Sequence, residues 1–344
     1  MCNKLRLGIV GFGRIVELVH LPIIKSIEEI EVHGVFDITL ERRVLAEKRG
    51  FSVYASLEEM LRSPIDAVLI ATPPNSHFSL AVQALEAGKH LIVEKPVTVN
   101  AREATKLLQL ARKVGKTVTV FQNRRYDGDF LLVKKVISEG MLGEILFVER
   151  RYDMFGTGDF FGVKSFHPSW RNEFHFGGGA LMDWGVHLAD QLLQLELGQI
   201  QELTSTSENL RWGKSEAEEY VHANMKLTNG ILMSMCVNFG SAARANSWVV
   251  GGDKSTLQVV SDKEAYLYRK GAAPELIQVP DTKRHAGKEI YMSLVNHIQN
   301  LGDLAVPLEQ AVETMTLLDA IRYSKLCNRR VEYGDFAVGT ADGV

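Results

Sequence analysis

The sequence lacks the features that mark several special classes of protein. Its 344 residues include only three cysteines, which are too few and too scattered for a disulfide framework or a zinc site. No apolar run approaches the ~20 residues of a membrane-spanning helix. Neither sign of charge dominates, because 39 lysines and arginines stand against 42 aspartates and glutamates. We therefore expect no metal, no nucleic acid and no membrane partner.

We expect no leader at the start of the chain. Residues 1–6 pass straight into an apolar segment, which leaves no room for a signal peptide, so we expect a cytoplasmic protein. The composition, 46% apolar and 24% charged, is typical of a soluble globular enzyme. The length favours two domains.

Apolar segments and helical patterns alternate in the first part of the chain. The segments show no polar alternation, as expected of strands covered on both faces. We expect strands at 5–10, 32–36, 66–71, 90–93 and 117–121. The patterns between them predict helices, with capping sequences at Ser56–Glu59 and Asn100–Glu103. This order predicts a Rossmann domain over residues 1–123, with a doubly wound parallel sheet.

The pattern changes after Asn123. A helix is expected at 129–139, a strand at 144–153, a strong helix at 180–196, and then strands that follow one another directly. Asn229-Gly230 is a hairpin signal. We therefore expect an α+β domain over residues 124–344 with a large, mostly antiparallel open sheet, and a C-terminal helix that packs back on the first domain. The alternating Met225, Met233 and Met235 suit either face of this sheet.

A glycine turn follows the first expected strand. Gly11-x-Gly13 lets the backbone approach a pyrophosphate at the start of a helix, although Val16 replaces the usual third small residue. Asp37 ends the second strand, where a carboxylate bonds the adenosine ribose and repels a 2′-phosphate. NAD is therefore favoured, while Arg42 and Arg43 keep NADP open.

A rigid loop, Thr72-Pro73-Pro74-Asn75, follows the third strand on the expected cofactor side. It either lines the cofactor or forms a simple turn with a helix cap. His77 at the start of the next helix belongs either to the cofactor site or to the exposed helix start.

Glu94-Lys95-Pro96 follows the next strand. Ligands bind outside the carboxyl ends of parallel strands, so a lysine there can meet a substrate and exchange protons. The alternative is a surface salt bridge.

A second group of polar residues lies in the second domain. Gly177-Gly178-Gly179 opens a helix and leaves backbone N–H groups for a ligand or another chain. Asp183 and His187 are four residues apart and share one helix face. Histidine is the usual acid or base near neutral pH. The alternative is a helix-surface pair, but the apolar residues around it predict a buried helix.

In these motifs the chain resembles the Gfo/Idh/MocA family of sugar and polyol oxidoreductases. The resemblance covers essentially the whole chain. It implies that Lys95 polarises or protonates the substrate oxygen, His187 takes the hydroxyl proton and Asp183 holds a neighbouring hydroxyl. It also implies a cis bond before Pro96. The expected cofactor-binding residues are Gly11, Phe12, Gly13, Arg14, Ile15, Asp37, Thr72, Pro73, Asn75, His77, Glu94, Lys95 and Asn123.

The expected substrate-binding residues are Lys95, Arg124, Trp170, Arg171, Asp183 and His187. Arg124 and Arg125 either bind polyhydroxy groups or form interdomain ion pairs, and Trp170 either faces a sugar or packs. Residues 121–127 further resemble a branch that includes scyllo-inositol dehydrogenases, whose members often prefer NADP.

The expected function is hydride transfer between NAD(P) and a sugar or a cyclic, inositol-like polyol. The alternatives are a glycosidase that uses transient oxidation by bound NAD and a non-enzymatic sugar sensor. The family also implies a homodimer or homotetramer.

Overall fold

The computed structural model describes residues 4–156, 166–210, 216–282 and 287–336, and each of its two units has its own sheet. Unit 1 comprises Met1–Gln122, Gly158–Gly177 and Gly287–Met315. Unit 2 comprises Asn123–Thr157, Gly178–Ala286 and Thr316–Val344. Unit 1 therefore takes in two later segments that lie within the range expected for the second domain.

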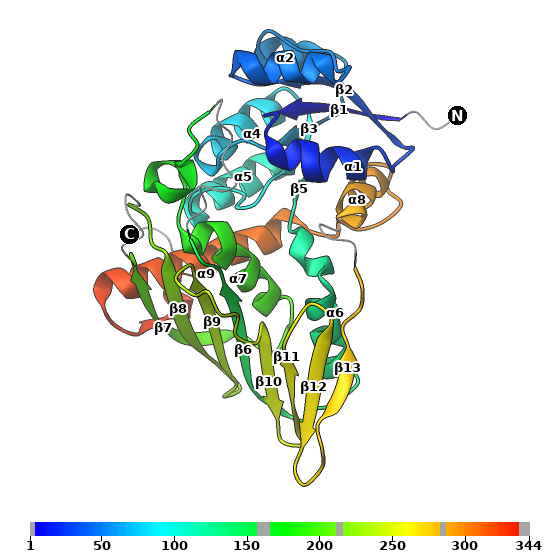
Figure 1. Ribbon diagram of the computed structural model, residues 1–344. Helices are drawn as coiled ribbons and strands as arrows, with labels where there is room; N and C mark the ends of the chain where they lie inside the picture. The colour runs from blue at the N-terminus through cyan, green and yellow to red at the C-terminus, as the bar shows by residue number, and fades with distance from the viewer. Residues whose placement is uncertain (1–3, 157–165, 211–215, 283–286, 337–344) are drawn as a thin grey trace. The chain divides into compact units, whose positions relative to one another are not determined.

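The sheet of unit 1 is parallel throughout, in the order β2-β1-β3-β4-β5 (Figure 1). Its strands are β1 Leu5–Val10, β2 Ile30–Phe36, β3 Ala67–Ile70, β4 His90–Val93 and β5 Val118–Val120. The central strand β3 is buried along its whole length, as expected of a sheet covered on both faces. The prediction of a doubly wound parallel sheet is confirmed. The strand order reverses between β1 and β3, where such sheets bind ligands.

The helices of unit 1 begin where their capping residues predict. The Ser56 hydroxyl accepts a hydrogen bond from the backbone N–H of Glu59 at 3.1 Å, and the Asn100 side chain accepts one from Glu103 at 2.8 Å. The helical segments are η1 Val16–His20 (a wide π-helical turn), α1 Leu21–Ile24, α2 Leu40–Lys48, α3 Leu57–Arg62, η2 Pro74–Ser76, α4 His77–Glu86, α5 Ala101–Val114, η5 Trp170–Asn172, η6 Phe174–Phe176 and α8 Lys288–Ile298.

Unit 2 contains a nine-stranded sheet in the order β13-β12-β11-β10-β6-β9-β8-β7-β14. The neighbours β6 and β9 run parallel and the other pairs run antiparallel, which confirms the mostly antiparallel sheet. The strands are β6 Ile145–Asp153, β7 Ile200–Glu208, β8 Tyr220–Leu227, β9 Leu232–Asn238, β10 Trp248–Gly252, β11 Ser255–Val259, β12 Glu264–Arg269, β13 Glu275–Gln278 and β14 Val331–Glu332.

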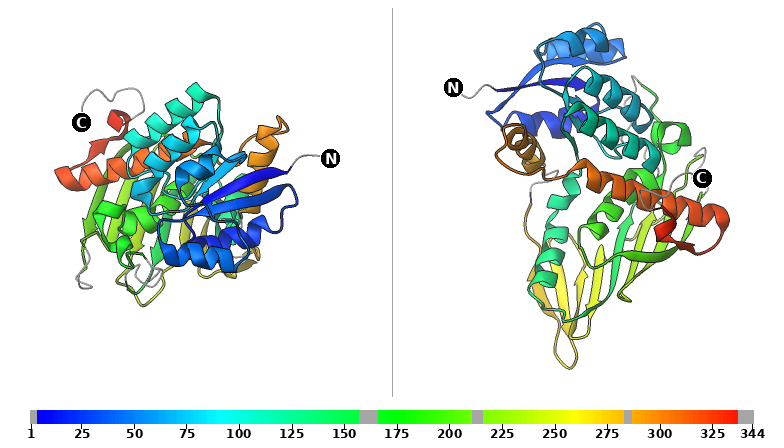
Figure 2. Two further views of the ribbon diagram at one scale, coloured as in Figure 1. Left: turned by 90° about the horizontal axis from the view of Figure 1, so that it is seen from above. Right: turned by 180° about the vertical axis from the view of Figure 1, so that it is seen from behind.

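Helices cover one face of this second sheet (Figures 1 and 2). The helical segments of unit 2 are η3 Asn123–Tyr126, α6 Gly128–Ser138, η7 Leu181–Gly185, α7 Val186–Leu193 and η8 Tyr333–Phe336. The helix α9 Leu308–Cys327 begins in unit 1 and belongs to unit 2 from Thr316 on. α7 contacts β6, α6 contacts β10, and η7 contacts β8 and β9.

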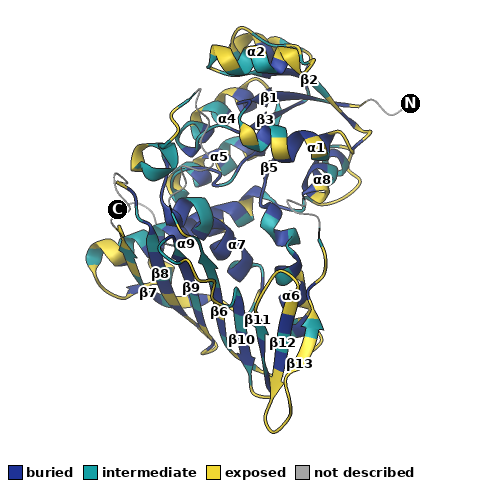
Figure 3. Ribbon diagram, in the orientation of Figure 1, coloured by how far each residue is buried: buried dark blue, intermediate teal, exposed yellow. Residues whose placement is uncertain are grey.

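The three alternating methionines face these helices. Met225, Met233 and Met235 are at most 6% exposed, and a Cβ placed on Gly185 of η7 would lie 3.3 Å from the methyl carbon of Met235. Figure 3 shows much of α7 and of the strands beside it as buried. Asn224, which precedes Met225 on β8, is exposed. The core of unit 2 therefore lies between the sheet and its helices.

Candidate active site

The glycine turn after β1 brings backbone and carboxylate together. The backbone N–H of Phe12 donates to Asp37 at 2.7 Å, and the other carboxylate oxygen accepts from the N–H and hydroxyl of Thr39 at 2.8 and 2.9 Å. Gly11 has a φ of +89°, and a Cβ there would lie 2.6 Å from the Ala71 carbonyl oxygen. A Cβ on Gly13 would meet nothing within 4 Å, which leaves room for a phosphate to approach. These residues fit a dinucleotide.

The two arginines near Asp37 have protein partners. The Arg42 guanidinium lies 3.1 Å from a Glu17 carboxylate oxygen, and that of Arg43 donates to the Ala55 carbonyl at 3.4 Å. Both groups are therefore partly engaged within the protein.

His77 ties the loop after β3 to the turn after β4. Its Nδ1 lies 2.8 Å from the Pro96 carbonyl oxygen, and its Nε2 lies 2.8 Å from that of Thr72. Its side chain is fully buried, so the alternative of an exposed histidine is wrong. Burial lowers its pKa below the usual value, against the carbonyl contacts and the Glu94 charge, which raise it. Within the same loop, the hydroxyls of Thr72 and Ser76 lie 2.6 Å apart, and Ser76 donates to the Pro73 carbonyl. Asn75 is half-buried in η2.

Lys95 follows a buried carboxylate at the carboxyl end of β4. Glu94 accepts from the backbone N–H of Lys95 at 3.0 Å, and its other oxygen lies 2.9 Å from His20 Nε2. His20 Nδ1 lies 2.8 Å from the Tyr291 hydroxyl. Burial raises the pKa of Glu94, but the hydrogen bond and charge of His20 outweigh it and lower the pKa overall. Glu94 is only 7% exposed, so it is not half of a surface salt bridge. The peptide bond before Pro96 is cis, as the resemblance implies.

The glycines before Asp183 meet a buried carboxylate that the sequence did not reveal. The backbone N–H of Ala180 donates to the Glu218 carbonyl at 2.8 Å, and that of Leu181 donates to the Glu218 carboxylate at 3.0 Å. A Cβ on Gly179, where φ is +108°, would lie 2.5 Å from that carboxylate. Burial raises the pKa of Glu218. The N–H groups of Ala180 and Leu181, just after the glycines, are therefore bound by Glu218.

The segment that carries Asp183 and His187 is not one regular helix. The expected helix at 180–196 is a wide π-helical turn, η7, followed by α7. Asp183 lies in the wide turn, where its N–H donates to the Gly179 carbonyl at 2.9 Å. His187 lies in the first turn of α7 and is 5% exposed. Wide turns of this kind are frequent at functional sites.

Buried ion pairs hold η3 against α7 within unit 2. The Arg125 guanidinium binds both carboxylate oxygens of Asp190 at 2.8 and 2.6 Å. This pair lies inside unit 2, so it is not the interdomain ion pair that was one of the two alternatives for Arg125. Arg124 lies 3.2 Å from Asp127 and 5.0 Å from the centre of the Trp184 ring. Asn123, the first residue of η3, is 7% exposed.

Trp170 and Arg171 form a local stack in η5. The Arg171 guanidinium lies 4.2 Å from the centre of the Trp170 ring, and both side chains are half-buried.

The functional network contains residues that the sequence reasoning missed. These residues are His20, Tyr152, Asp190, Glu218 and Tyr291. For His20, Asp190 and Tyr291 the available signal was a polar residue within an apolar pattern, whereas Tyr152 and Glu218 have charged neighbours and gave no such signal. Their partners are distant in sequence, so no local spacing identifies them.

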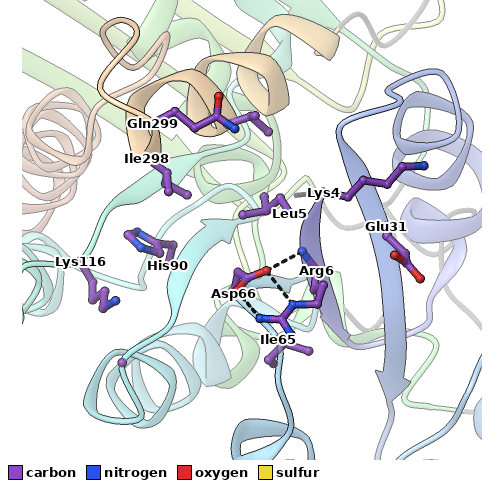
Figure 4. A pocket seen from close by; sticks show the side chains of 12 residues that line it. Lys4, Leu5, Arg6, Glu31, Ile65, Asp66, His90, Lys116, Ile298 and Gln299 are labelled. Carbon is purple, nitrogen blue, oxygen red and sulfur yellow. Dashed lines mark hydrogen bonds and ion pairs between the residues drawn. The ribbon is translucent and has the colours of Figure 1, made fainter. Parts of the chain in front are cut away.

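A pocket of about 710 Å³ lies at the opposite edge of the parallel sheet (Figure 4). Its lining includes Leu5, Asp66 and His90, which stand at or next to the amino ends of β1, β3 and β4. Arg6 and Asp66 form an ion pair there at 2.8 Å. This pocket is therefore separate from the edge that carries the glycine turn and Lys95. Among the described residues, no group of side chains suits a metal ion and no helix is long and apolar enough to cross a membrane.

Two models of known protein families match this chain, one within each of the two expected domains. The family model "Oxidoreductase family, NAD-binding Rossmann fold" matches residues 5–122, and "GFO/IDH/MocA C-terminal domain" matches residues 130–258. The chain belongs to the Gfo/Idh/MocA family of oxidoreductases. Residues 5–122 therefore match the NAD-binding Rossmann domain of this family.

Individual relatives are about a third identical to this chain over the aligned residues. It is 34% identical over 224 residues to the uncharacterized oxidoreductase YdgJ of Escherichia coli, which covers 65% of this chain and 62% of YdgJ. It is 30% identical over 280 residues to the scyllo-inositol 2-dehydrogenase (NADP(+)) IolW of Bacillus subtilis, with 79% and 74% covered. The crystal structure of an NAD-binding protein from Listeria innocua has a TM-score of 0.88 at 30% identity and covers 99% of this chain and 100% of that one. The chain thus spans less than two thirds of the length of YdgJ.

Proposed function

We propose that this oxidoreductase transfers a hydride between NAD(P) and a sugar or a cyclic, inositol-like polyol. The observation that carries the proposal is the placement of Lys95. It stands at the carboxyl end of β4, on a turn anchored by His20 and His77, at the sheet edge that carries the glycine turn. The scyllo-inositol activity named for the Bacillus relative supports the polyol class.

Each polar side chain has a role in this reaction. The bound nicotinamide would accept the hydride from the carbon that bears the reacting hydroxyl. His187 accepts the hydroxyl proton during oxidation and returns it during reduction. Lys95 donates a hydrogen bond to the substrate oxygen and so polarises it, and Asp183 accepts a hydrogen bond from a neighbouring hydroxyl.

We also propose that NAD(H) is preferred over NADP(H). Within the described residues, the Asp37 oxygen that faces Phe12 accepts one hydrogen bond, so it can also accept one from a ribose hydroxyl. The carboxylate would repel a 2′-phosphate, and Arg42 is already paired with Glu17.

Two further proposals concern the cellular location and the oligomeric state. We propose a cytoplasmic enzyme that works as a homodimer or homotetramer on a small-molecule substrate. Light scattering of the purified protein would test this assembly, and a monomeric mass would contradict it.

The test is a panel of inositols, aldoses and keto-sugars, each with NAD(H) and NADP(H), read at the nicotinamide absorbance. Net turnover of added cofactor separates a dehydrogenase from a glycosidase that recycles its bound NAD. Lys95→Ala should lower turnover by roughly 10²–10⁴-fold and leave cofactor binding intact. Lys106→Ala, at an exposed position on α5, is the matched control. Near-normal turnover by Lys95→Ala would refute the mechanism.

His187→Asn tests the proton acceptor. Oxidation needs the neutral imidazole, so the wild-type rate should fall at low pH, and the variant should lose both most of its activity and this acidic limb. A variant that keeps the wild-type pH profile and only has a higher KM would make His187 a substrate ligand instead.

A further inference from the structure

Tyr152 is the aromatic side chain packed against the turn that carries Asp183. It lies near the end of β6, and its ring stacks on Trp184, with centroids 3.5 Å apart and an angle of 11° between the planes. Trp184 follows Asp183 directly, and its ring centre is 5.9 Å from that of His187. The phenol therefore belongs to the same local cluster as the two proposed active-site residues of unit 2.

The ring of Tyr152 is held without the help of its hydroxyl. Trp184 holds it by stacking, and the Arg124 guanidinium lies 5.0 Å from the centre of the Trp184 ring. Arg124 is in turn paired with Asp127, and Gln191 of α7 donates to the Arg124 carbonyl at 2.7 Å. Position and orientation of the phenol are thus set by ring contacts.

The hydroxyl itself has no hydrogen-bond partner in the part of the chain that the structure describes. Phenols in partly buried sites usually find one. Burial raises the pKa of Tyr152 to about 12; the Asp183 carboxylate raises it as well, against the opposing charges of Arg124, Arg244 and Arg150. The phenol therefore keeps its proton at any working pH and is a neutral hydrogen-bond donor and acceptor.

We propose that Tyr152 is a substrate-binding residue whose hydroxyl forms a hydrogen bond with a hydroxyl of the polyol next to the one that Asp183 holds. The inference rests on the proposed function and adds a specificity-determining contact to it. A substrate with hydroxyls on adjacent carbons would meet both side chains, whereas a substrate that lacks the second hydroxyl would leave the phenol unbonded.

The experiment uses Tyr152→Phe, which keeps the ring stack and removes only the oxygen. The matched control is Tyr268→Phe on β12, which lies three strands from β6 in the same sheet. Both variants and the wild type are assayed with scyllo-inositol, myo-inositol and their monodeoxy derivatives. Tyr152→Phe should raise KM for the parent polyol roughly 3- to 10-fold, the effect of one neutral hydrogen bond. The control should match the wild type.

Three readouts distinguish a substrate contact from a structural role. For one monodeoxy derivative, the wild type and Tyr152→Phe should have the same KM, because the hydroxyl that met the phenol is gone. The pH profile and the melting temperature should not move. Two results for Tyr152→Phe would overturn the inference while the proposed function stands. One is an unchanged KM for the parent polyols, and the other is an equal rise in KM for every derivative. If the wild type turns over no polyol, the proposed function fails and the inference fails with it.

Discussion

The buried ion pair between Arg125 and Asp190 offers a direct test of how unit 2 is held together. The two side chains are 8% and 2% exposed, and two short hydrogen bonds join them. The pair links η3 to α7 three residues after His187. Asp190→Asn keeps the shape of the side chain and removes its charge, which leaves a buried guanidinium facing a neutral amide.

The expected loss of stability follows from the burial of the ion pair. Removing one partner of a buried pair costs about 3–5 kcal/mol, because the remaining charge is left uncompensated. For a domain of this size each kcal/mol lowers the melting temperature by about 2–4 °C, so the variant should melt roughly 6–20 °C lower. The amide still accepts one hydrogen bond, which favours the lower end. Thermal melting followed by circular dichroism measures the shift.

The control is an exposed pair in the same unit. Arg269 and Glu275 are 45% and 51% exposed, so Glu275→Gln should cost less than about 1 kcal/mol. A double variant, Arg125→Met with Asp190→Leu, should recover part of the loss, because it removes both charges. If Asp190→Asn melts no lower than Glu275→Gln, the pair does not hold η3 to α7 and the reasoning is wrong.

Three further predictions follow from the charges and caps of the two units. Asp37→Ser should shift the ratio of kcat/KM values from NAD(H) toward NADP(H); a wild type that already prefers NADP(H) would refute the assignment. Glu218→Ala should lower the free energy of unfolding by about 0.5–2 kcal/mol in urea, because the Leu181 N–H loses its acceptor, whereas Glu218→Gln should lose less; equal losses would argue against the cap. Burial lowers the pKa of His90 from 6.5 to about 4, so the unfolded chain binds more protons between these values and stability falls as the pH drops through this window. His90→Asn keeps an acceptor for the Thr117 N–H and should flatten the fall in denaturation curves across that range; an unchanged slope would contradict it.

Features set by neighbouring residues could be predicted from the sequence. The strands Leu5–Val10 and His90–Val93 have the expected bounds, because unbroken apolar runs mark them. Ser56 and Asn100 cap helices because their side chains reach an N–H three residues on. The mostly antiparallel second sheet followed from alternating strands and the Asn229-Gly230 turn. All of these signals are local.

The wide turn at Leu181–Gly185 could not be predicted in the same way. Apolar spacing along 180–196 indicates a helix but does not distinguish a regular turn from a wide one, since both bury nearly the same residues. The segment begins at Gly179, where the Glu218 carboxylate occupies the place of a Cβ. A contact between residues 37 positions apart thus shapes the start of the turn.

The burial of His77 was missed for a related reason. A polar residue at a helix start is commonly exposed, and nothing near it in the sequence suggests otherwise. Its partners are the carbonyls of Thr72 and Pro96, and the second of these lies beyond the whole of α4 and β4. The position of the histidine depends on the sheet order, which brings the ends of β3 and β4 together.

The side chains that carry the proposed chemistry lie on short motifs, but buried partners far away in the sequence hold those motifs. Lys95 follows Glu94, which meets His20, and His20 meets Tyr291, 271 residues from it. Burying a polar group costs free energy of folding unless the group is hydrogen-bonded, so each side chain in this series requires the next one as its partner. Tyr291→Phe would leave every motif intact and still remove a partner of the histidine that contacts Glu94. The motifs alone therefore do not position Lys95 for the proposed reaction.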